Sequence, residues 1–244
     1  MDPAFEQLRA AAEILHVPLT PRALVGLGAY TAELLRWRER LNLTGADTAA
    51  EVVNPHLIDV CLAVAKVRIP EGASVVDIGT GAGLPGIPLK LIRPGLAMVL
   101  VETSRKKVSF LEHVRSVLDL GDLRIEHGRA EAVGHKPECR ERFDVSLTQA
   151  TADLSVGVEL ILPFVRVGGA GVCLKGAGIL EEVSEAMALI DVLGGQIESS
   201  EEYALPTTAT KRTVVVIRKV RSTPEEFARS SRALGRPPAS HKGT

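Results

Sequence analysis

The residues best suited to ligand binding form a glycine-rich run, VVDIGTGAGLPGIPL, at residues 75–89. Four glycines within eight residues follow a short apolar segment that ends in an acid. A strand, a glycine turn and a helix place such a run at the carboxyl edge of a parallel sheet, where open α/β folds bind ligands. Because glycine lets a ligand approach the backbone closely, we expect a cofactor here.

Two registers of this run point to different adenosine-containing cofactors. Residues 81–86 satisfy the G-x-G-x-x-G pattern of NAD-binding proteins, but in that register the strand ends too early. Counted from the strand, Asp77 lies two residues before a G-x-G-x-G that begins at Gly79, which is typical of S-adenosylmethionine methyltransferases. An acid beside the loop is compatible with a sulfonium cation and poorly suited to a pyrophosphate.

Two further segments fit an adenosine ligand. Glu102 ends the next strand-like run, about twenty residues after the loop, where a carboxylate can accept both ribose hydroxyls. This spacing does not choose between NAD and S-adenosylmethionine. Ala130 and Glu131 follow the third strand-like run, where the adenine ring of a methyltransferase cofactor would lie. Glu131 also suits the N-terminus of a helix, whose dipole favours an acid.

The elements that must position these residues alternate between strands and helices from residue 73 onward. This alternation predicts an α/β fold with a doubly wound, mostly parallel sheet. The predicted strands lie at residues 73–78, 97–102, 122–127, 143–150, 170–175 and 212–219. The predicted helices in this part follow Leu84 and cover residues 104–118, 153–165 and 180–193.

The first 68 residues read as a helical N-terminal extension. Residues 4–16 have an apolar face, Thr20 and Pro21 resemble the start of a helix that reaches about Leu41, and residues 48–51 fit a capping box. We therefore divide the chain into this extension, a cofactor-binding domain at residues 69–221, and a basic tail at residues 222–244 whose last fifteen or so residues are poorly able to pack.

Composition narrows the classes of function. The three cysteines are far apart and are expected to be buried thiols, and neither they nor the six histidines have the spacing of a metal site. No apolar run is long enough to span a bilayer, and the acidic N-terminus does not resemble a signal peptide, so we expect a cytoplasmic protein. Residues 203–244 carry nine Lys or Arg against two Glu, a net charge of +7, which leaves −8 for residues 1–202. That end is a candidate contact for a polyanion, or a solvated tail.

A series of motifs in one order makes the class more specific. The sequence resembles the glucose-inhibited division protein B family, the small-subunit (16S) ribosomal RNA guanine-N7 methyltransferases, over roughly residues 30–220. The segments that carry the resemblance are Asn42-Leu43-Thr44, His56-Leu57-Ile58-Asp59, residues 77–89, Arg105-Lys106-Lys107, Gly128-Arg129-Ala130-Glu131, and Leu162-Pro163-Phe164 leading to Leu174-Lys175-Gly176. The leucine, proline and glycine at residues 84–86 are more specific than G-x-G-x-G alone.

The resemblance implies a seven-stranded class I methyltransferase fold, S-adenosylmethionine as cofactor, and ribosomal RNA or the small ribosomal subunit as partner of a monomeric enzyme. By the same resemblance, Glu102 would hold the ribose, and the other cofactor contacts would be Gly79, Gly81, Leu84, Ala130, Glu131 and Gln149.

Two departures from the family pattern stand out. Thr148-Gln149-Ala150 replaces the usual Ser-Arg-Ala, and the basic, proline-rich ending is only loosely echoed by residues 232–238.

The reaction that the resemblance implies would explain why no catalytic acid–base set is found in the sequence. Guanine N7 carries a lone pair and no proton, so methyl transfer needs alignment rather than a general base. N7 faces the narrow major groove of A-form RNA, so the target base should be unpaired or accessible in an incompletely assembled particle. The candidate phosphate contacts are Arg105, Lys106, Lys175, Lys211 and Arg212. Arg105–Lys107 could equally be an ordinary solvated helix turn.

Several other residues are better explained by a structural role than by substrate binding. His56 and Asp59 lie one helical turn apart and suit a buried pair that docks the extension better than a substrate contact. Tyr30 and Trp37 suit the core. The alternatives to an RNA methyltransferase are a small-molecule methyltransferase with a helical lid and an NAD-binding Rossmann protein.

Overall fold

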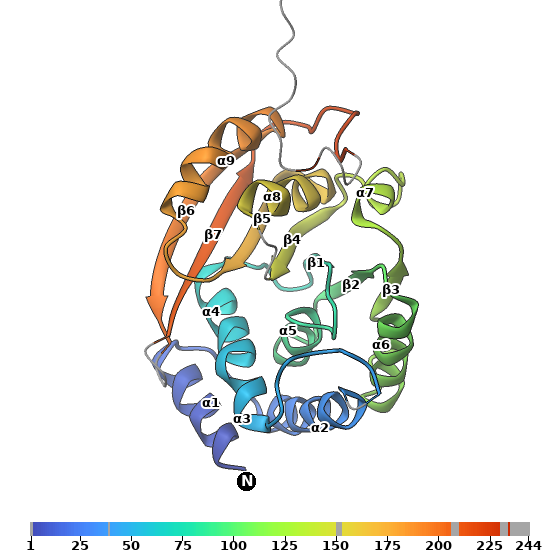
Figure 1. Ribbon diagram of the computed structural model, residues 1–244, viewed down its shortest axis with the longest axis vertical. Helices are drawn as coiled ribbons and strands as arrows, with labels where there is room; N and C mark the ends of the chain where they lie inside the picture. Colours follow the sequence, from blue (N-terminus) through green and yellow to red (C-terminus); the bar gives the residue numbers. More distant parts are fainter. Residues whose placement is uncertain (1, 39, 150–152, 206–209, 230–233, 235–244) are drawn as a thin grey trace, which may run out of the picture.

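A single sheet organises the computed structural model, which describes residues 2–38, 40–149, 153–205, 210–229 and 234. Within these residues seven strands pair in the order β3-β2-β1-β4-β5-β7-β6 (Figure 1). Strands β1 to β5 run parallel, and β7 is antiparallel to both of its neighbours. The bounds are β1 Ser74–Ile78, β2 Ala97–Glu102, β3 Arg124–His127, β4 Phe143–Gln149, β5 Val165–Lys175, β6 Gly195–Ala204 and β7 Lys211–Lys219. The predicted fold class is confirmed.

The strand order reverses between β1 and β4. From β1 the chain first builds outward through β2 and β3 and then returns to place β4 on the other side of β1. Connections after β1 and β4 therefore diverge at the carboxyl edge, which opens a crevice there. The glycine-rich run follows β1, so it lies at this crevice.

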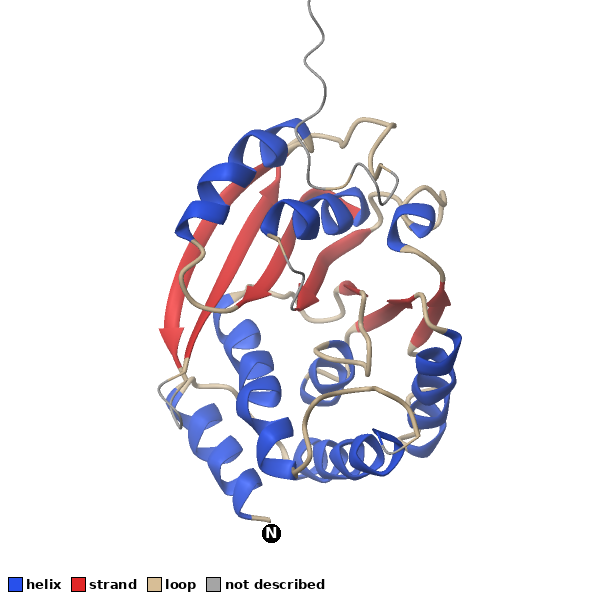
Figure 2. Cartoon of the chain, viewed as in Figure 1, coloured by secondary structure: helices blue, strands red, loops and turns tan. Residues whose placement is uncertain are grey.

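Helices cover both faces of the sheet (Figure 2). The α-helices are α1 Pro3–Ile14, α2 Pro21–Arg38, α3 Ala49–Glu51, α4 Ile58–Lys66, α5 Gly86–Ile92, α6 Arg105–Val117, α7 Ala130–Val133, α8 Leu154–Ile161 and α9 Leu180–Val192, with a π-helix η1 at Val52–Leu57 and a 3₁₀ turn η2 at Leu162–Phe164. No helix in the described ranges combines the length and apolar composition that crossing a membrane requires.

Two apolar cores lie on opposite faces of the sheet because successive strand residues point to opposite sides. Val75 joins the core beneath α1, α2, α4, α5 and α6, whereas Val76 and Ile78 join the core beneath α7, α8 and α9. The helical extension shares the first core with the sheet. All three cysteines are buried and free, as predicted.

The helix predictions hold in most places. Thr20 caps α2 by accepting a hydrogen bond from the Ala23 amide at 3.1 Å, and Thr48 caps α3. The predicted helix at residues 153–165 was too long, because α8 ends at Ile161 and β5 already begins at Val165. Between them Pro163 lies in the 3₁₀ turn, where its missing amide hydrogen removes no α-helical bond.

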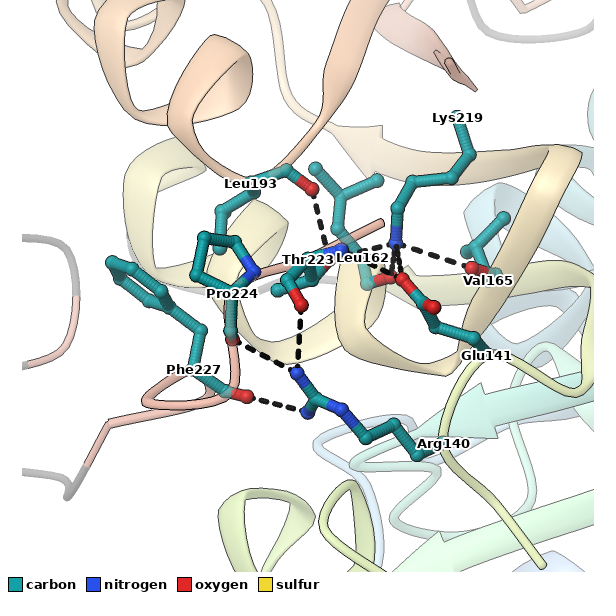
Figure 3. Close-up of polar contacts among 9 residues, drawn as sticks. All are labelled: Arg140, Glu141, Leu162, Val165, Leu193, Lys219, Thr223, Pro224 and Phe227. Atoms are coloured by element: carbon teal, nitrogen blue, oxygen red, sulfur yellow. Dashed lines mark hydrogen bonds and ion pairs between the residues drawn. The ribbon is translucent and has the colours of Figure 1, made fainter. Parts of the chain in front are cut away.

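The segment after β7 is bound to residues just before β4, at the edge of the sheet where the parallel strands begin, opposite the carboxyl edge (Figure 3). Lys219 is fully buried, and its ammonium contacts the Glu141 carboxylate at 3.0 Å and the Thr223 hydroxyl at 2.7 Å. Arg140 donates to three main-chain carbonyls of the segment, those of Thr223, Pro224 and Phe227. Residues 222–229 of the predicted tail therefore pack on the domain, while residues 230–233 and 235–244, which hold most of the family ending at 232–238, lie outside the described residues.

Candidate functional site

The glycine run forms a tight turn between β1 and α5. Gly79, Gly81 and Gly83 have φ angles of 68°, 60° and 91°, in the left-handed region that favours glycine. A Cβ on Gly83 would lie 2.4 Å from Ile87 Cδ1, and one on Gly86 would lie 2.4 Å from Leu100 Cδ2. A Cβ on Gly79 would meet no atom within 4 Å. Packing therefore requires Gly83 and Gly86, whereas Gly79 leaves open space for a ligand.

Asp77 holds the turn from below. Its Oδ2 accepts hydrogen bonds from the Thr80 hydroxyl at 2.6 Å and from the Gly86 amide at 2.9 Å. The side chain is fully buried, and Oδ1 has no hydrogen-bond partner. Burial, with a smaller contribution from the Glu102 carboxylate, raises the pKa of Asp77 to about 7. Asp77 thus shapes the loop from inside the protein.

The helical extension also holds this loop. Tyr30 of α2 is fully buried, and its hydroxyl donates to the Ala82 carbonyl at 2.9 Å. The expectation that Tyr30 belongs to the core is confirmed, but its hydrogen bond to the glycine loop was missed. Helical periodicity shows which face of a helix is buried and carries no signal for a partner 52 residues away.

Glu102 ends β2 beside the loop. Its Oε2 accepts from the Gly81 amide at 2.9 Å and its Oε1 accepts from the Ser104 amide at 2.8 Å. The residue is 6% exposed. The Thr103 hydroxyl also donates to Oε1, at 3.3 Å. A carboxylate offers about four acceptor positions, so the two amide bonds fix the group, Oε2 keeps a free position for a ribose hydroxyl, and a second is gained if the Thr103 hydroxyl turns away.

A cavity of about 210 Å³ lies at the carboxyl edge. Its described lining is formed by Ile78, Gly79, Val101, Thr103, Gly128, Ala130, Glu131, Thr148, Gln149 and Leu160. Gly79, Ala130, Glu131 and Gln149, four of the predicted cofactor contacts, thus meet in one space. Gly81 and Glu102 are joined to each other beside it, and Leu84 packs partly buried against the first core.

Gln149 links this cavity to a buried ion pair. Its Nε2 donates to Asp59 Oδ2 at 2.9 Å, and the same carboxylate pairs with the Arg212 guanidinium, whose Nε lies 3.0 Å from both oxygens. Asp59 is 2% exposed, and its burial raises its pKa while Arg212 opposes that rise. Burial also lowers the pKa of the neighbouring His56, whose Nδ1 has no hydrogen-bond partner.

The expected hydrogen-bonded pair of His56 and Asp59 is not what the structure shows. The docking contact of Asp59 is the ion pair with Arg212 from β7 rather than a hydrogen bond from His56. Gln149 stands where the family has an arginine. The Arg212 guanidinium binds the same Asp59 carboxylate as Gln149, so a cation lies close to that position. Ala150, the last residue of that departure, lies outside the described residues.

The predicted RNA contacts lie in different settings. Arg105 and Lys106 are exposed on the first turn of α6. Lys175 is 5% exposed and pairs with Glu182 at 2.8 Å, and Lys211 pairs with Glu202 at 2.8 Å. Arg212 is 18% exposed and is the partner of Asp59. Whether any of them contacts RNA stays a prediction.

The sheet order, the glycine turn after β1 and the acid that ends β2 together define an S-adenosylmethionine-dependent methyltransferase fold. The chain is similar to the Thermus thermophilus TrmN structure (TM-score 0.51, 15% identity, 67% of this chain and 49% of that one). It is also similar to the Methanococcus jannaschii fibrillarin pre-rRNA processing protein (TM-score 0.50, 16% identity, 66% and 75%). At such identities these likenesses support the fold alone.

Sequence comparison defines the family. Residues 24–215 match the GidB family model, rRNA small subunit methyltransferase G. The Ribosomal RNA small subunit methyltransferase G of Alkaliphilus oremlandii is 36% identical over 224 residues, which cover 92% of this chain and 94% of that protein. The protein of the same name from Thermoanaerobacter pseudethanolicus is 38% identical over 209 residues (86% and 87%). The chain belongs to the rRNA small subunit methyltransferase G family.

The residues around the cavity fit S-adenosylmethionine better than a dinucleotide. Strand β1 ends at Ile78, so the loop begins at Gly79, in the register typical of S-adenosylmethionine methyltransferases, and the cavity lining includes the acid Glu131. The open space at Gly79 and the anchored carboxylate of Glu102 suit an adenosine that carries a sulfonium group. The G-x-G-x-x-G register is therefore incidental.

Proposed function

We propose that this protein transfers a methyl group from S-adenosylmethionine to N7 of a guanine in small-subunit (16S) ribosomal RNA. The observation that carries the proposal is the cavity at the carboxyl edge. Gly79 of the glycine-rich run lines this cavity together with Ala130, Glu131 and Gln149. Membership in the rRNA small subunit methyltransferase G family supports the substrate.

Cofactor binding is assigned to residues already held in place. In this proposal Glu102 accepts the ribose hydroxyls, and the Gly81 and Ser104 amides keep its two oxygens oriented. Ala130 and Glu131 frame the adenine, and Gly79 and Leu84 contact the rest of the cofactor. When bound, S-adenosylmethionine supplies the electrophilic methyl group.

Alignment rather than proton transfer accounts for the chemistry. The N7 lone pair would form the new bond to the methyl carbon while the carbon–sulfur bond breaks and its electron pair stays on the sulfur, so no side chain has to remove a proton. Gln149 lines the cavity and is held by Asp59, and we assign it a neutral hydrogen-bonding contact with the cofactor or the target guanine. Its amide lacks the charge and planar fork of arginine. The positive charge that would bind the RNA phosphates must therefore come from neighbouring residues.

The cations around the crevice are assigned to phosphates of an unpaired RNA segment. Lys211 is exposed but paired with Glu202, whereas Arg105 and Lys106 are exposed on the first turn of α6. Their place in the first turn of α6 opposes the helix dipole, which favours acids there, and contact with phosphates would offset that cost. Lys175, Lys211 and Arg212 would act around the same crevice. We further propose that the enzyme works as a monomer in the cytoplasm.

One experiment tests the proposed reaction directly. Small-subunit ribosomal RNA from cells that lack this protein should lose one N7-methylguanosine, and the purified protein with S-adenosylmethionine should restore it. Calorimetric titration should show saturable binding of S-adenosylmethionine and none of NAD. An unchanged methylation pattern in the deletion strain would refute the substrate, and binding of NAD alone would refute the cofactor.

A further inference from the structure

A hollow at the end of α2 is not explained by the cofactor site. It measures about 280 Å³, and its described lining is formed by Arg36, Trp37 and Arg40. On its buried side the indole of Trp37 packs against α6. The distance between ring centroids is 4.9 Å from Trp37 to His113 and 5.7 Å from Trp37 to Phe110. Trp37 is only partly buried, so part of this anchored ring faces the hollow. A guanidinium pair beside an aromatic ring is a combination that binds a base and its phosphate.

The hollow is organised before any ligand arrives. Glu33 of α2 binds Arg36 Nη2 at 2.6 Å and His113 Nε2 at 2.7 Å, so one carboxylate ties the two helices together. This pairing uses part of the Arg36 fork, and a guanidinium has five donors in all. Two residues further along, Arg38 is directed elsewhere, toward Asp47 and the Ala46 carbonyl. Arg36 and Arg40 are thus the arginines of this helix end that line the hollow.

Helix α6 connects the hollow to the cofactor loop. Lys106 and His113 are seven residues apart and therefore lie on the same face of α6, about 10 Å from each other. At the same end of α6 as Lys106, the Lys107 ammonium lies 3.8 Å from the position of a Cβ on Gly81. Lys106 and Lys107 near the glycine loop, and Arg36 beside His113 at the hollow, are therefore separated by about two turns of α6. A short single strand of RNA can span that distance.

We propose that the hollow formed by Arg36, Trp37 and Arg40 binds a nucleotide of single-stranded RNA that flanks the methylated guanine. The base stacks on the indole of Trp37, and the guanidinium groups bind the adjacent phosphates. This inference rests on the proposed function, because it takes the RNA substrate from it, and it adds a subsite that selects an unpaired neighbour of the target. The bland alternative is that Trp37 only fills the contact between α2 and α6.

Trp37 is the only tryptophan in the chain, so its fluorescence reports on this hollow alone. Titration of the full-length protein with the single-stranded hexanucleotide A₆ should quench that fluorescence in a saturable way. Binding measured independently, by the anisotropy of fluorescein-labelled A₆, should give the same affinity. Arg40→Gln should weaken binding several-fold and lower the slope of log affinity against log salt by about 0.7, the value for one phosphate contact of a single strand.

Arg22→Gln is the matched control. Arg22 is exposed on the same helix, about 21 Å from Arg36, and it does not line the hollow. This variant should keep the affinity and the quenching of the unmodified protein. Unchanged Trp37 fluorescence when the anisotropy has saturated would overturn the proposal, as would equal salt slopes for Arg40→Gln and Arg22→Gln.

The same proteins separate this inference from the proposed function. If the protein methylates small-subunit RNA while Trp37 does not respond to A₆, the subsite is wrong and the methyltransferase assignment stands. If A₆ quenches Trp37 in an Arg40-dependent way while no N7-methylguanosine forms, the nucleotide site stands and the proposed reaction is wrong.

Discussion

Replacing Tyr30 with phenylalanine removes one hydroxyl and keeps the ring that packs in the core. The hydroxyl donates to the Ala82 carbonyl at 2.9 Å, and Tyr30 and Ala82 are 0% and 3% exposed. Water therefore cannot replace the lost donor. Leaving a buried carbonyl without its partner costs about 1–3 kcal/mol, so the free energy of unfolding should fall by that amount.

The effect should not depend on pH in the neutral range. Burial, and then the nearby Asp77 carboxylate, raise the pKa of Tyr30 well above its ordinary value, so the hydroxyl keeps its proton and stays a donor. Because Ala82 belongs to the turn that contains Gly79 and Gly81, the variant should also bind S-adenosylmethionine more weakly than the unmodified protein.

Urea unfolding followed by circular dichroism gives the stability, and calorimetric titration gives the cofactor affinity. Tyr203→Phe is the matched control, since the chain has two tyrosines and the Tyr203 hydroxyl bonds to Glu201 at the surface. It should change stability by no more than about 0.5 kcal/mol. Our account of the loop is refuted if Tyr30→Phe is no more destabilising than Tyr203→Phe.

Four further outcomes are expected. Glu102→Ala should cost about 1.5–3 kcal/mol of S-adenosylmethionine affinity by calorimetry, because charged-group hydrogen bonds are lost; an unchanged affinity would move the ribose site elsewhere. Burial raises the pKa of Asp77 from its ordinary value of 3.8 to about 7 in the folded protein, so the protonated form stabilises the fold and this stability is lost as pH rises from about 4 through 7. Between pH 5 and pH 8 the loss is about 3 kcal/mol, from roughly two pKa units; Asp77→Asn should remove that part of the difference between urea unfolding at pH 5 and at pH 8, and an identical pH profile would contradict the assignment. Gln149→Ala and Gln149→Arg should both lower methylation of small-subunit particles, whereas a silent alanine and a several-fold gain with arginine would mean that the site has drifted. Deleting residues 230–244 should flatten the salt dependence of RNA binding and leave cofactor affinity intact, since fewer phosphates are contacted; an equal slope would make the tail a bystander.

Local patterns in the sequence were enough to predict most of the elements and the cofactor loop. The glycines after β1, the acid at Glu102 and the alternation of strands with helices depend on backbone geometry and periodicity over a few residues. Strand β6 shows where such patterns fail. It lies at the sheet edge with most of its residues exposed or half-buried, so it lacks the run of apolar residues that predicted the central strands.

Tertiary structure alone decided which distant side chains meet. Asp59 binds Gln149 and Arg212, which are 90 and 153 residues away in the chain, and no local pattern announces those partners. The sequence motif identified Gln149 as a departure, but only the fold brought Arg212 to the carboxylate that holds it. The hollow at Arg36, Trp37 and Arg40 likewise depends on α6, whose His113 and Phe110 anchor the indole. Periodicity indicates which face of an element is buried, whereas the packing of α2, α4, α6 and β7 determines what that face touches.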